Sequence, residues 1–121
     1  MSSFKNFIEQ KSGLDDLVQM LRRQYPGLDL HVWENDSKIE LSNITVPEDL
    51  RGRGIGSNIV NTLKDYAKQV GKPVVVRPSP EKGKIAALNR FYTRHKFVKN
   101  KGRNLDFSLS SPFAATRYWK P

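Results

Sequence analysis

Val46-Pro-Glu-Asp-Leu-Arg-Gly-Arg-Gly-Ile-Gly-Ser57 is the stretch of this 121-residue chain that decides its fold. Its three glycines alternate with other residues, and arginines stand directly before the first two of them. Alternating apolar residues precede the stretch, and apolar residues at helical spacing follow it. A glycine-rich turn between a strand and a helix presents backbone N–H groups at the positive end of the helix dipole. The stretch therefore predicts a loop that binds phosphate.

Other interpretations of this loop differ in the spacing that they need. A dinucleotide-binding loop needs Gly-x-Gly-x-x-Gly, whereas this loop has Gly-x-Gly-x-Gly. A Walker loop ends in Gly-Lys-Ser/Thr, which is absent here. Arg-Gly-Arg-Gly also occurs in RNA-binding segments, but those are usually disordered, and this one adjoins a strongly periodic helix. A plain glycine-rich connecting turn remains the simplest alternative.

Upstream of the loop, the periodicity predicts a helix followed by two strands. The helix is expected to begin at Ser12 as N-cap and to stop at Pro26-Gly27. Residues 28–33 alternate as a strand, and a second strand starts at Ile39. The apolar phase of this second strand flips part-way along, which predicts a β-bulge near residues 42–43.

Downstream of the loop, a helix is expected over 55–70 and a strand buried on both faces over 74–76. A second helix covers roughly 84–95, extended chain resumes at 97–98, and alternation over 105–110 predicts a last strand. This order predicts one α/β domain spanning 1–121, with a mixed central sheet that contains a bulged strand and is flanked by helices.

Two motifs together resemble the GNAT superfamily of N-acetyltransferases. Arg51-x-x-Gly54-x-Gly56 is similar to the family's Gln/Arg-x-x-Gly-x-Gly/Ala signature, at the start of a long helix. Residues 91–97, Phe-Tyr-Thr-Arg-His-Lys-Phe, match its aromatic-Tyr-x-x-x-Gly-Phe pattern, with Lys96 in place of the glycine. Ile85 stands where the family often carries an asparagine. The resemblance covers about residues 28–110.

The resemblance implies an enzyme that moves an acetyl group from acetyl-CoA to an amine by direct attack in a ternary complex. The amine would belong to a small molecule, a peptide or a protein. Tyr92 would protonate the leaving sulfur, and Glu40 would be the base, with Glu34 or a water chain as alternatives. The other implied contacts are to the cofactor, from Ile44, Thr45, Val46, Arg51, Gly52, Arg53, Gly54, Ile55, Gly56, Ser57 and Asn89. A contact of Arg90, Arg94 or Lys96 with the 3′-phosphate of coenzyme A is a weaker expectation.

The charge of the chain is unevenly distributed. Residues 1–65 have a net charge of −2, residues 66–121 have +11, and the whole chain has +9. Such asymmetry indicates a polyanionic partner, although solubility alone is a simpler explanation. The rival function is a catalytically silent GNAT-fold module that binds nucleic acid. An acceptor borne on a nucleic acid or a ribosome would unite both features, with Lys99, Lys101 and Arg103 as the candidate patch.

Composition restricts the remaining possibilities. The chain has no cysteine, which excludes disulfides and a cysteine nucleophile, and two histidines make a metal site an unfavoured expectation. No apolar run reaches the roughly 18–20 residues of a membrane helix. The polar first eleven residues do not resemble a secretory signal. We therefore expect a cytoplasmic monomer or homodimer that uses acetyl-CoA and no metal.

Overall fold

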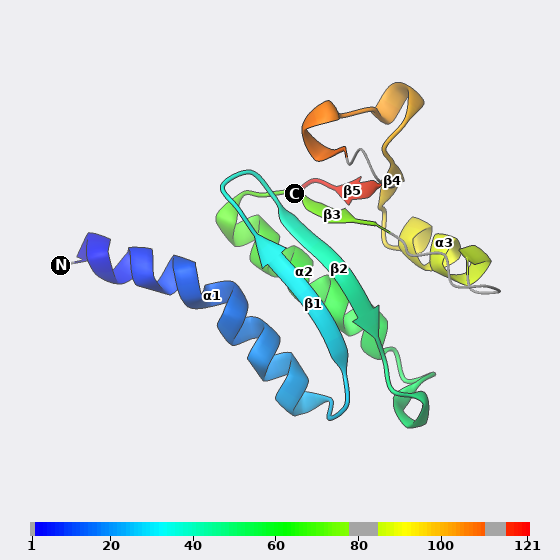
Figure 1. Cartoon of the computed structure of the whole chain (residues 1–121), viewed down its shortest axis with the longest axis horizontal. Helices are drawn as coiled ribbons and strands as arrows, with labels where there is room; N and C mark the ends of the chain where they lie inside the picture. The colour runs from blue at the N-terminus through cyan, green and yellow to red at the C-terminus, as the bar shows by residue number, and fades with distance from the viewer. Residues whose placement is uncertain (1, 78–84, 111–115) are drawn as a thin grey trace.

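The chain forms a five-stranded mixed sheet with helices packed against it (Figure 1). The computed structural model describes residues 2–77, 85–110 and 116–121, with the backbone alone at 2–12 and 85. The strands lie in the order β1-β2-β3-β5-β4, and only β2 and β3 run parallel. The predicted mixed α/β sheet is confirmed. The α-helices and strands are α1 (Ser2–Gln24), β1 (Asp29–Glu34), β2 (Ile39–Thr45), α2 (Ile55–Val70), β3 (Val74–Val76), α3 (Ile85–Arg94), β4 (Val98–Lys99) and β5 (Arg117–Trp119).

The core lies between α2 and the sheet. Most buried residues of α2 are spaced three or four positions apart, so they share one face of the helix, and this apolar face packs on the sheet. Val74 and Val76 meet it from β3, and Val75 is equally buried on the other face of that strand. The α1 helix adds Leu14, Val18 and Leu21 to the same cluster. The buried residues of α2 are Ile55, Ile59, Val60, Leu63 and Ala67.

The bulge expected near residues 42–43 is present. Along the antiparallel β1–β2 pair, His31 faces Asn43, but the next residue, Val32, faces Leu41. Ser42 is therefore the extra residue on β2. This insertion explains the phase flip, because Leu41 and Ile44 both turn inward although they are three residues apart.

Two expectations about secondary structure are wrong: the start of the first helix and the place of the last strand. Helix α1 begins at Ser2, so Ser12 lies inside it and is not the N-cap. The last strand is β5, and residues 105–110 instead contain the short 3₁₀ helix η3 (Phe107–Leu109). Of the three alternating apolar residues there, Leu109 is buried, whereas Leu105 and Phe107 are exposed. Among the described residues, no strand pairs with residues 105–110, because residues 117–119 of β5 occupy the place between β3 and β4.

The end of α3 shows what the lysine at position 96 does to the chain. Phe97 N donates to Tyr92 O (2.9 Å) and Lys96 N donates to Thr93 O (3.0 Å), which is the Schellman pattern. The rings of Tyr92 and Phe97 pack edge to face, 5.5 Å apart. This motif needs a left-handed residue before Phe97, and Lys96 accordingly has φ +69°. A glycine would take that conformation without strain, which is a physical reason for the family's glycine.

Candidate cofactor cleft

A cleft opens where β2 separates from β3. Their parallel pairing ends at Leu41 and Val76, directly before the bulge. After the bulge, the backbone N–H and C=O groups of residues 42–46 that point away from β1 do not pair with β3. The space encloses about 740 Å³ and reaches from this strand to one face of α3. Its lining from β2 and the loop is Leu41, Ser42, Asn43, Ile44, Thr45, Val46, Arg51 and Gly52; from the other wall come Arg77, Ala87, Leu88, Arg90, Phe91, Tyr92 and Arg94.

The glycine-rich loop continues this cleft as a shallow depression at the start of α2. Gly54 is the N-cap, with φ +73°, and Gly52 is also left-handed, with φ +80°. Nothing lies within 4 Å of where a Cβ would stand on either glycine, so the space beside the backbone is open. The first α2 hydrogen bond is donated by Asn58 N to Gly54 O (3.0 Å), which leaves the N–H groups of residues 55–57 ahead of it. Residues 50–52 and 54–57 line the depression.

Arg51 shapes the loop as well as charging it. Its Nε donates to the carbonyl oxygen of Val46 (3.0 Å), which closes the turn between β2 and α2. The short 3₁₀ helix η1 (Glu48–Leu50) lies inside this turn. Of the other predicted loop residues, Arg53 lines neither the cleft nor the depression.

The loop is fastened to α3 at two points. A Cβ on Gly56 would stand 3.4 Å from the ring of Phe91, so this glycine allows α2 and α3 to approach closely. The next residue, Ser57, places its Oγ 2.9 Å from Nε2 of His95, which lies one turn beyond Phe91. Partial burial, together with the cations Lys64 and Arg94, lowers the pKa of His95, so the ring favours its neutral form. The position of Gly56 could be predicted from sequence, whereas the Ser57–His95 contact joins residues 38 apart and could not.

Tyr92 lies on the cleft wall formed by α3. It is only 4% exposed, but it belongs to the cleft lining together with Phe91, whose ring packs edge to face against it. Burial raises the pKa of Tyr92 to about 12 because the phenolate would lose its hydration. The phenol therefore keeps its proton throughout the neutral and mildly alkaline range.

Glu40 lies on the opposite face of the sheet from the α2 core and is buried, with 5% of its surface exposed. Its Oε2 accepts hydrogen bonds from the Trp33 indole (2.8 Å) and the Arg77 guanidinium (2.8 Å), which balance the charge of the carboxylate. Glu40 is not part of the cleft lining, but Arg77 is. Glu34, the alternative base, is likewise engaged, by Tyr66 and Lys72.

Asn89 faces away from the cleft. Its Oδ1 accepts a hydrogen bond from Arg117 of β5 (2.9 Å), and it is not part of the cleft lining. Arg117 is 5% exposed and also reaches Thr93 (3.4 Å) and the carbonyl of Phe97 (3.5 Å), so it ties α3 to the sheet. The contacts of Asn89 are those of a structural residue, and its contact with a cofactor stays a prediction.

The electrostatics of the cleft suit an anion. Among the described residues, its lining contains no aspartate or glutamate, and no acidic side chain occupies the first turn of α2. Arg77 was missed from sequence, although a cation directly after the carboxyl end of a parallel strand is a usable signal. In the part of the chain that the structure describes, the cations of the lining are Arg51, Arg77, Arg90 and Arg94.

Two further findings concern metals and membranes. Within residues 2–77, 85–110 and 116–121, no group of three or more metal-binding side chains comes together. In the same part of the chain, no helix is long and apolar enough to cross a membrane.

Comparison with known proteins agrees with this geometry. The model of the acetyltransferase (GNAT) family matches residues 27–97, which include the bulged strand, the loop and α3. The chain therefore belongs to the GNAT family of acetyltransferases. No sequence among curated proteins matches it significantly.

Solved structures share the fold. The crystal structure of the anti-CRISPR protein AcrVA5 aligns with a TM-score of 0.58 and 21% identity, over 78% of this chain and 90% of that one. Ard1 from Thermoplasma volcanium aligns with a TM-score of 0.55 and 18% identity, over 87% and 78%. The N-acetyltransferase YlbP of Bacillus subtilis, solved with coenzyme A, aligns with a TM-score of 0.48 and 18% identity, over 78% and 59%.

Proposed function

We propose that this protein transfers the acetyl group of acetyl-CoA to an amine by direct attack in a ternary complex. The observation that carries the proposal is a cleft and an adjoining depression that share part of their lining, including Arg51 and Phe91. The cleft contains the separated edge of β2 and Tyr92, and the depression contains the open glycine loop at the start of α2. Each of these three parts matches one part of the cofactor: the pantetheine arm, the pyrophosphate and the thioester sulfur.

Binding would begin at the loop. The N–H groups of residues 55–57, the helix dipole and Arg51 all favour a pyrophosphate there. The pantetheine arm would then add to the backbone of Ile44, Thr45 and Val46 like an extra strand, because β3 no longer occupies that side. Arg90 and Arg94, on the facing wall, would meet the remaining phosphate charge.

The chemical step is nucleophilic addition followed by elimination. The neutral amine nitrogen forms a bond to the thioester carbon, and the carbonyl oxygen becomes an oxyanion stabilised by a backbone N–H of the bulged strand. The carbonyl then re-forms as the C–S bond breaks, the extra proton of the amine passes to the base, and the thiolate takes a proton from Tyr92, which regains one from solvent before the next turnover. Burial makes the phenol a weaker acid, but it makes a thiolate in the same cleft more basic, so the two remain matched.

The base of the reaction is proposed in two forms. Glu40 is the residue that the family resemblance names, but its Oε2 is occupied by Trp33 and Arg77. Its action as a base requires that this ion pair rearrange or that a water molecule relay the proton. Comparing Glu40→Gln with the unmodified protein over pH distinguishes the two forms. Loss of the acidic limb of kcat/KM supports Glu40, and an unchanged limb supports a water chain.

The acceptor is proposed as an amine of a small molecule, a peptide or a protein. The alternative function is a catalytically silent module of the same fold that binds nucleic acid or another polyanion through its basic C-terminal half. The net charge of +11 over residues 66–121 favours that alternative, and the intact cleft with Tyr92 favours the enzyme.

The first experiment measures cofactor binding and turnover. Acetyl-CoA at about 100 times its dissociation constant should stabilise the protein by about 2.7 kcal/mol. A screen of amines should then release free thiol. Tyr92→Phe should lower turnover by roughly 10²-fold, with little effect on acetyl-CoA affinity. An unchanged melting temperature in acetyl-CoA refutes the cofactor assignment, and normal turnover in the Phe variant refutes the acid role.

A further inference from the structure

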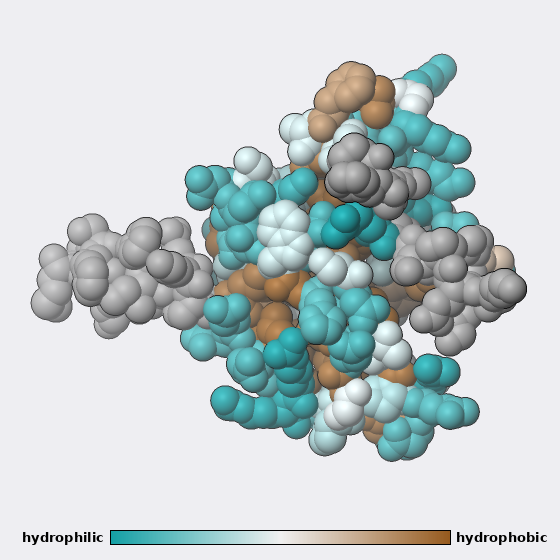
Figure 2. Space-filling model, in the orientation of Figure 1, coloured by the Kyte–Doolittle hydropathy of each residue, from teal (hydrophilic) through white to brown (hydrophobic). Residues whose placement is uncertain are grey.

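The segment between β4 and β5 holds a phenylalanine ring in water. Phe107, the first residue of η3, is 82% exposed, and Leu105 beside it is 45% exposed. Among the side chains that the structure describes, Phe107 is the most exposed large hydrophobic one. Hydrophobic atoms protrude at the top of Figure 2, in the region where Figure 1 shows this segment. An exposed ring of this size costs free energy that burial would recover, which suggests a binding role.

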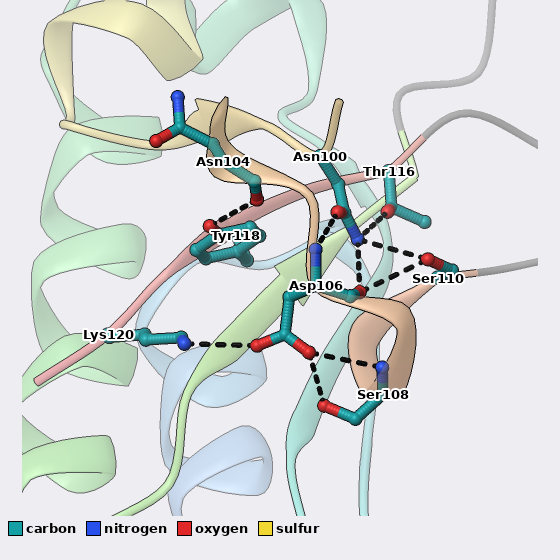
Figure 3. Close-up of polar contacts among 8 residues, drawn as sticks. All are labelled: Asn100, Asn104, Asp106, Ser108, Ser110, Thr116, Tyr118 and Lys120. Atoms are coloured by element: carbon teal, nitrogen blue, oxygen red, sulfur yellow. Dashed lines mark hydrogen bonds and ion pairs between the residues drawn. The ribbon is translucent and has the colours of Figure 1, made fainter. Parts of the chain in front are cut away.

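The turn beneath Phe107 is held by polar side chains (Figure 3). Asp106 caps η3 by accepting hydrogen bonds from the backbone N–H of Ser108 (3.0 Å) and from its hydroxyl (2.6 Å). The Asn100 amide accepts from Asp106 N (2.7 Å) and donates to Asp106 O (3.0 Å). Lys120 closes the other side of the Asp106 carboxylate at 3.0 Å. These bonds fix the backbone before any ligand arrives, which lowers the entropy that binding has to overcome.

The segment that carries the ring is cationic. Lys99, Lys101 and Arg103 are all exposed: Lys99 ends β4, Lys101 is the N-cap of the 3₁₀ helix η2 (Gly102–Asn104), and Arg103 lies within that helix. Tyr118 OH donates to Asn104 O (2.5 Å), which holds η2 against β5. The single acid in residues 96–110 is Asp106, and its charge is paired with Lys120. The turn therefore combines one free aromatic face with uncompensated positive charge.

We propose that this turn is a binding site for single-stranded nucleic acid. The ring of Phe107 stacks on a base, and Lys99, Lys101 and Arg103 neutralise neighbouring phosphates. Stacking platforms flanked by cations are the general way in which proteins hold single strands, because every base has a π-face and every nucleotide has a charge. None of these residues lines the cleft, so the site is independent of the proposed acetyl transfer.

An acidic protein fits the same surface less well. The centres of protein–protein contacts are apolar and depleted in lysine, with polar residues at the rim. Around Phe107, the second exposed large hydrophobic side chain of the described part of this segment is Leu105, and the rest of the exposed surface is polar or cationic. A single ring among cations is enough for a base and its phosphates, but it is small for the centre of a protein interface.

The test uses a fluorescein-labelled 15-nucleotide oligo(dT) and a duplex of equal length, with anisotropy measured at several salt concentrations between 50 and 200 mM. The unmodified protein should bind the single strand. Phe107→Ala should weaken binding by about 10-fold, within the roughly 5- to 150-fold expected for loss of one stacked base, without changing the salt dependence. Lys101→Ser with Arg103→Ser should flatten the slope of log affinity against log salt by about 1.4.

Two matched variants separate stacking from simpler causes. Phe107→Leu keeps an apolar side chain but removes the ring, so it should bind as weakly as Phe107→Ala. Arg23→Ser with Lys38→Ser removes the same charge from other elements and should leave the slope nearly unchanged. All variants are first checked for an unchanged melting temperature, which is expected because the replaced side chains are exposed, apart from that of Lys38, which is half-buried.

Three results would overturn the proposal. The first is no binding of the oligonucleotide by the unmodified protein at 50 mM salt. The second is equal binding of single strand and duplex with no loss in Phe107→Ala, which would mean generic attraction between charges. The third is full binding by Phe107→Leu, which would indicate an apolar docking contact. Each result is read without acetyl-CoA, so it leaves the proposed transferase activity untouched.

Discussion

The loop that opens α2 and the segment that joins β4 to β5 are both irregular, but different interactions order them. Residues 51–57 are shaped by backbone conformation, with left-handed glycines at 52 and 54. Residues 100–110 also contain one left-handed glycine, Gly102, but they are shaped mainly by side chains, the amide of Asn100 and the carboxylate of Asp106. The first arrangement leaves N–H groups available to an anion. The second uses its polar groups internally and presents a ring and cations instead.

The way a loop is ordered limits what it can bind. A loop built from glycines keeps its backbone donors and offers little side-chain surface. A loop built from hydrogen-bonding side chains has few free donors, but it holds its remaining side chains in place. Substitutions in the two loops, and at the end of α3 that contacts the first of them, should therefore have different effects.

Gly54→Glu should abolish acetyl-CoA binding, with an affinity loss of at least about 100-fold. The substitution strains a residue at φ +73° and places a carboxylate at the phosphate end of the cleft. Gly71→Glu is the matched control, because Gly71 also has φ +69° with open space around it, at the other end of α2. Both variants should lose similar stability, but only Gly54→Glu should lose the acetyl-CoA-dependent rise in melting temperature. Equal rises in the two variants would refute the phosphate assignment.

Asn100→Ala should destabilise the protein by about 2 kcal/mol, because Asp106 and Thr116 lose their shared amide partner. Asn104→Ala is the control in the same segment, since Asn104 contributes its backbone carbonyl rather than its side chain to Tyr118. Chemical denaturation measures both. The rise in melting temperature produced by acetyl-CoA should persist in each variant, since neither residue lines the cleft. A collapse of that rise in Asn100→Ala alone would show that the two regions are coupled.

Lys96→Gly should stabilise the protein by about 1 kcal/mol, because glycine removes the strain of a left-handed Cβ. Lys96→Ala keeps the Cβ and removes the charge, so it separates strain from repulsion between Lys96 and Lys64. Only the glycine variant should gain appreciably in denaturant titration. An equal gain in both variants would assign the effect to charge.

Acidification should weaken the contact between Ser57, in the glycine loop, and His95, at the end of α3. Burial and nearby cations lower the pKa of His95 in the folded state, so below about pH 6.5 the unfolded chain binds more protons. Stability from this residue is complete above that pH and declines as the pH falls below it. His95→Gln should reduce the slope of stability against pH between 6.5 and 5. A slope that is unchanged in His95→Gln contradicts this assignment.

Much of the fold was predictable because its signals are local. The helical spacing after residue 55, the valine strand, the phase flip at Ser42 and the two motifs each depend on neighbours within a few positions. The strand expected at 105–110 failed because alternation shows only which residues could share a face. Side-chain hydrogen bonds from Asn100 and Asp106 hold this segment in 3₁₀ turns, and residues 117–119 occupy the place beside β3.

Neighbouring residues are enough to predict the class of fold, the glycine loop and the place of Tyr92 on a helix, because backbone conformation and periodicity depend on residues that are close in the chain. What those residues contact follows from the way the helices and strands pack. This packing pairs Glu40 with Arg77, Ser57 with His95 and Asn89 with Arg117, all contacts between residues at least 28 positions apart. The packing also leaves the ring of Phe107 exposed to solvent. Such contacts depend on how the elements pack, and no local pattern contains that information.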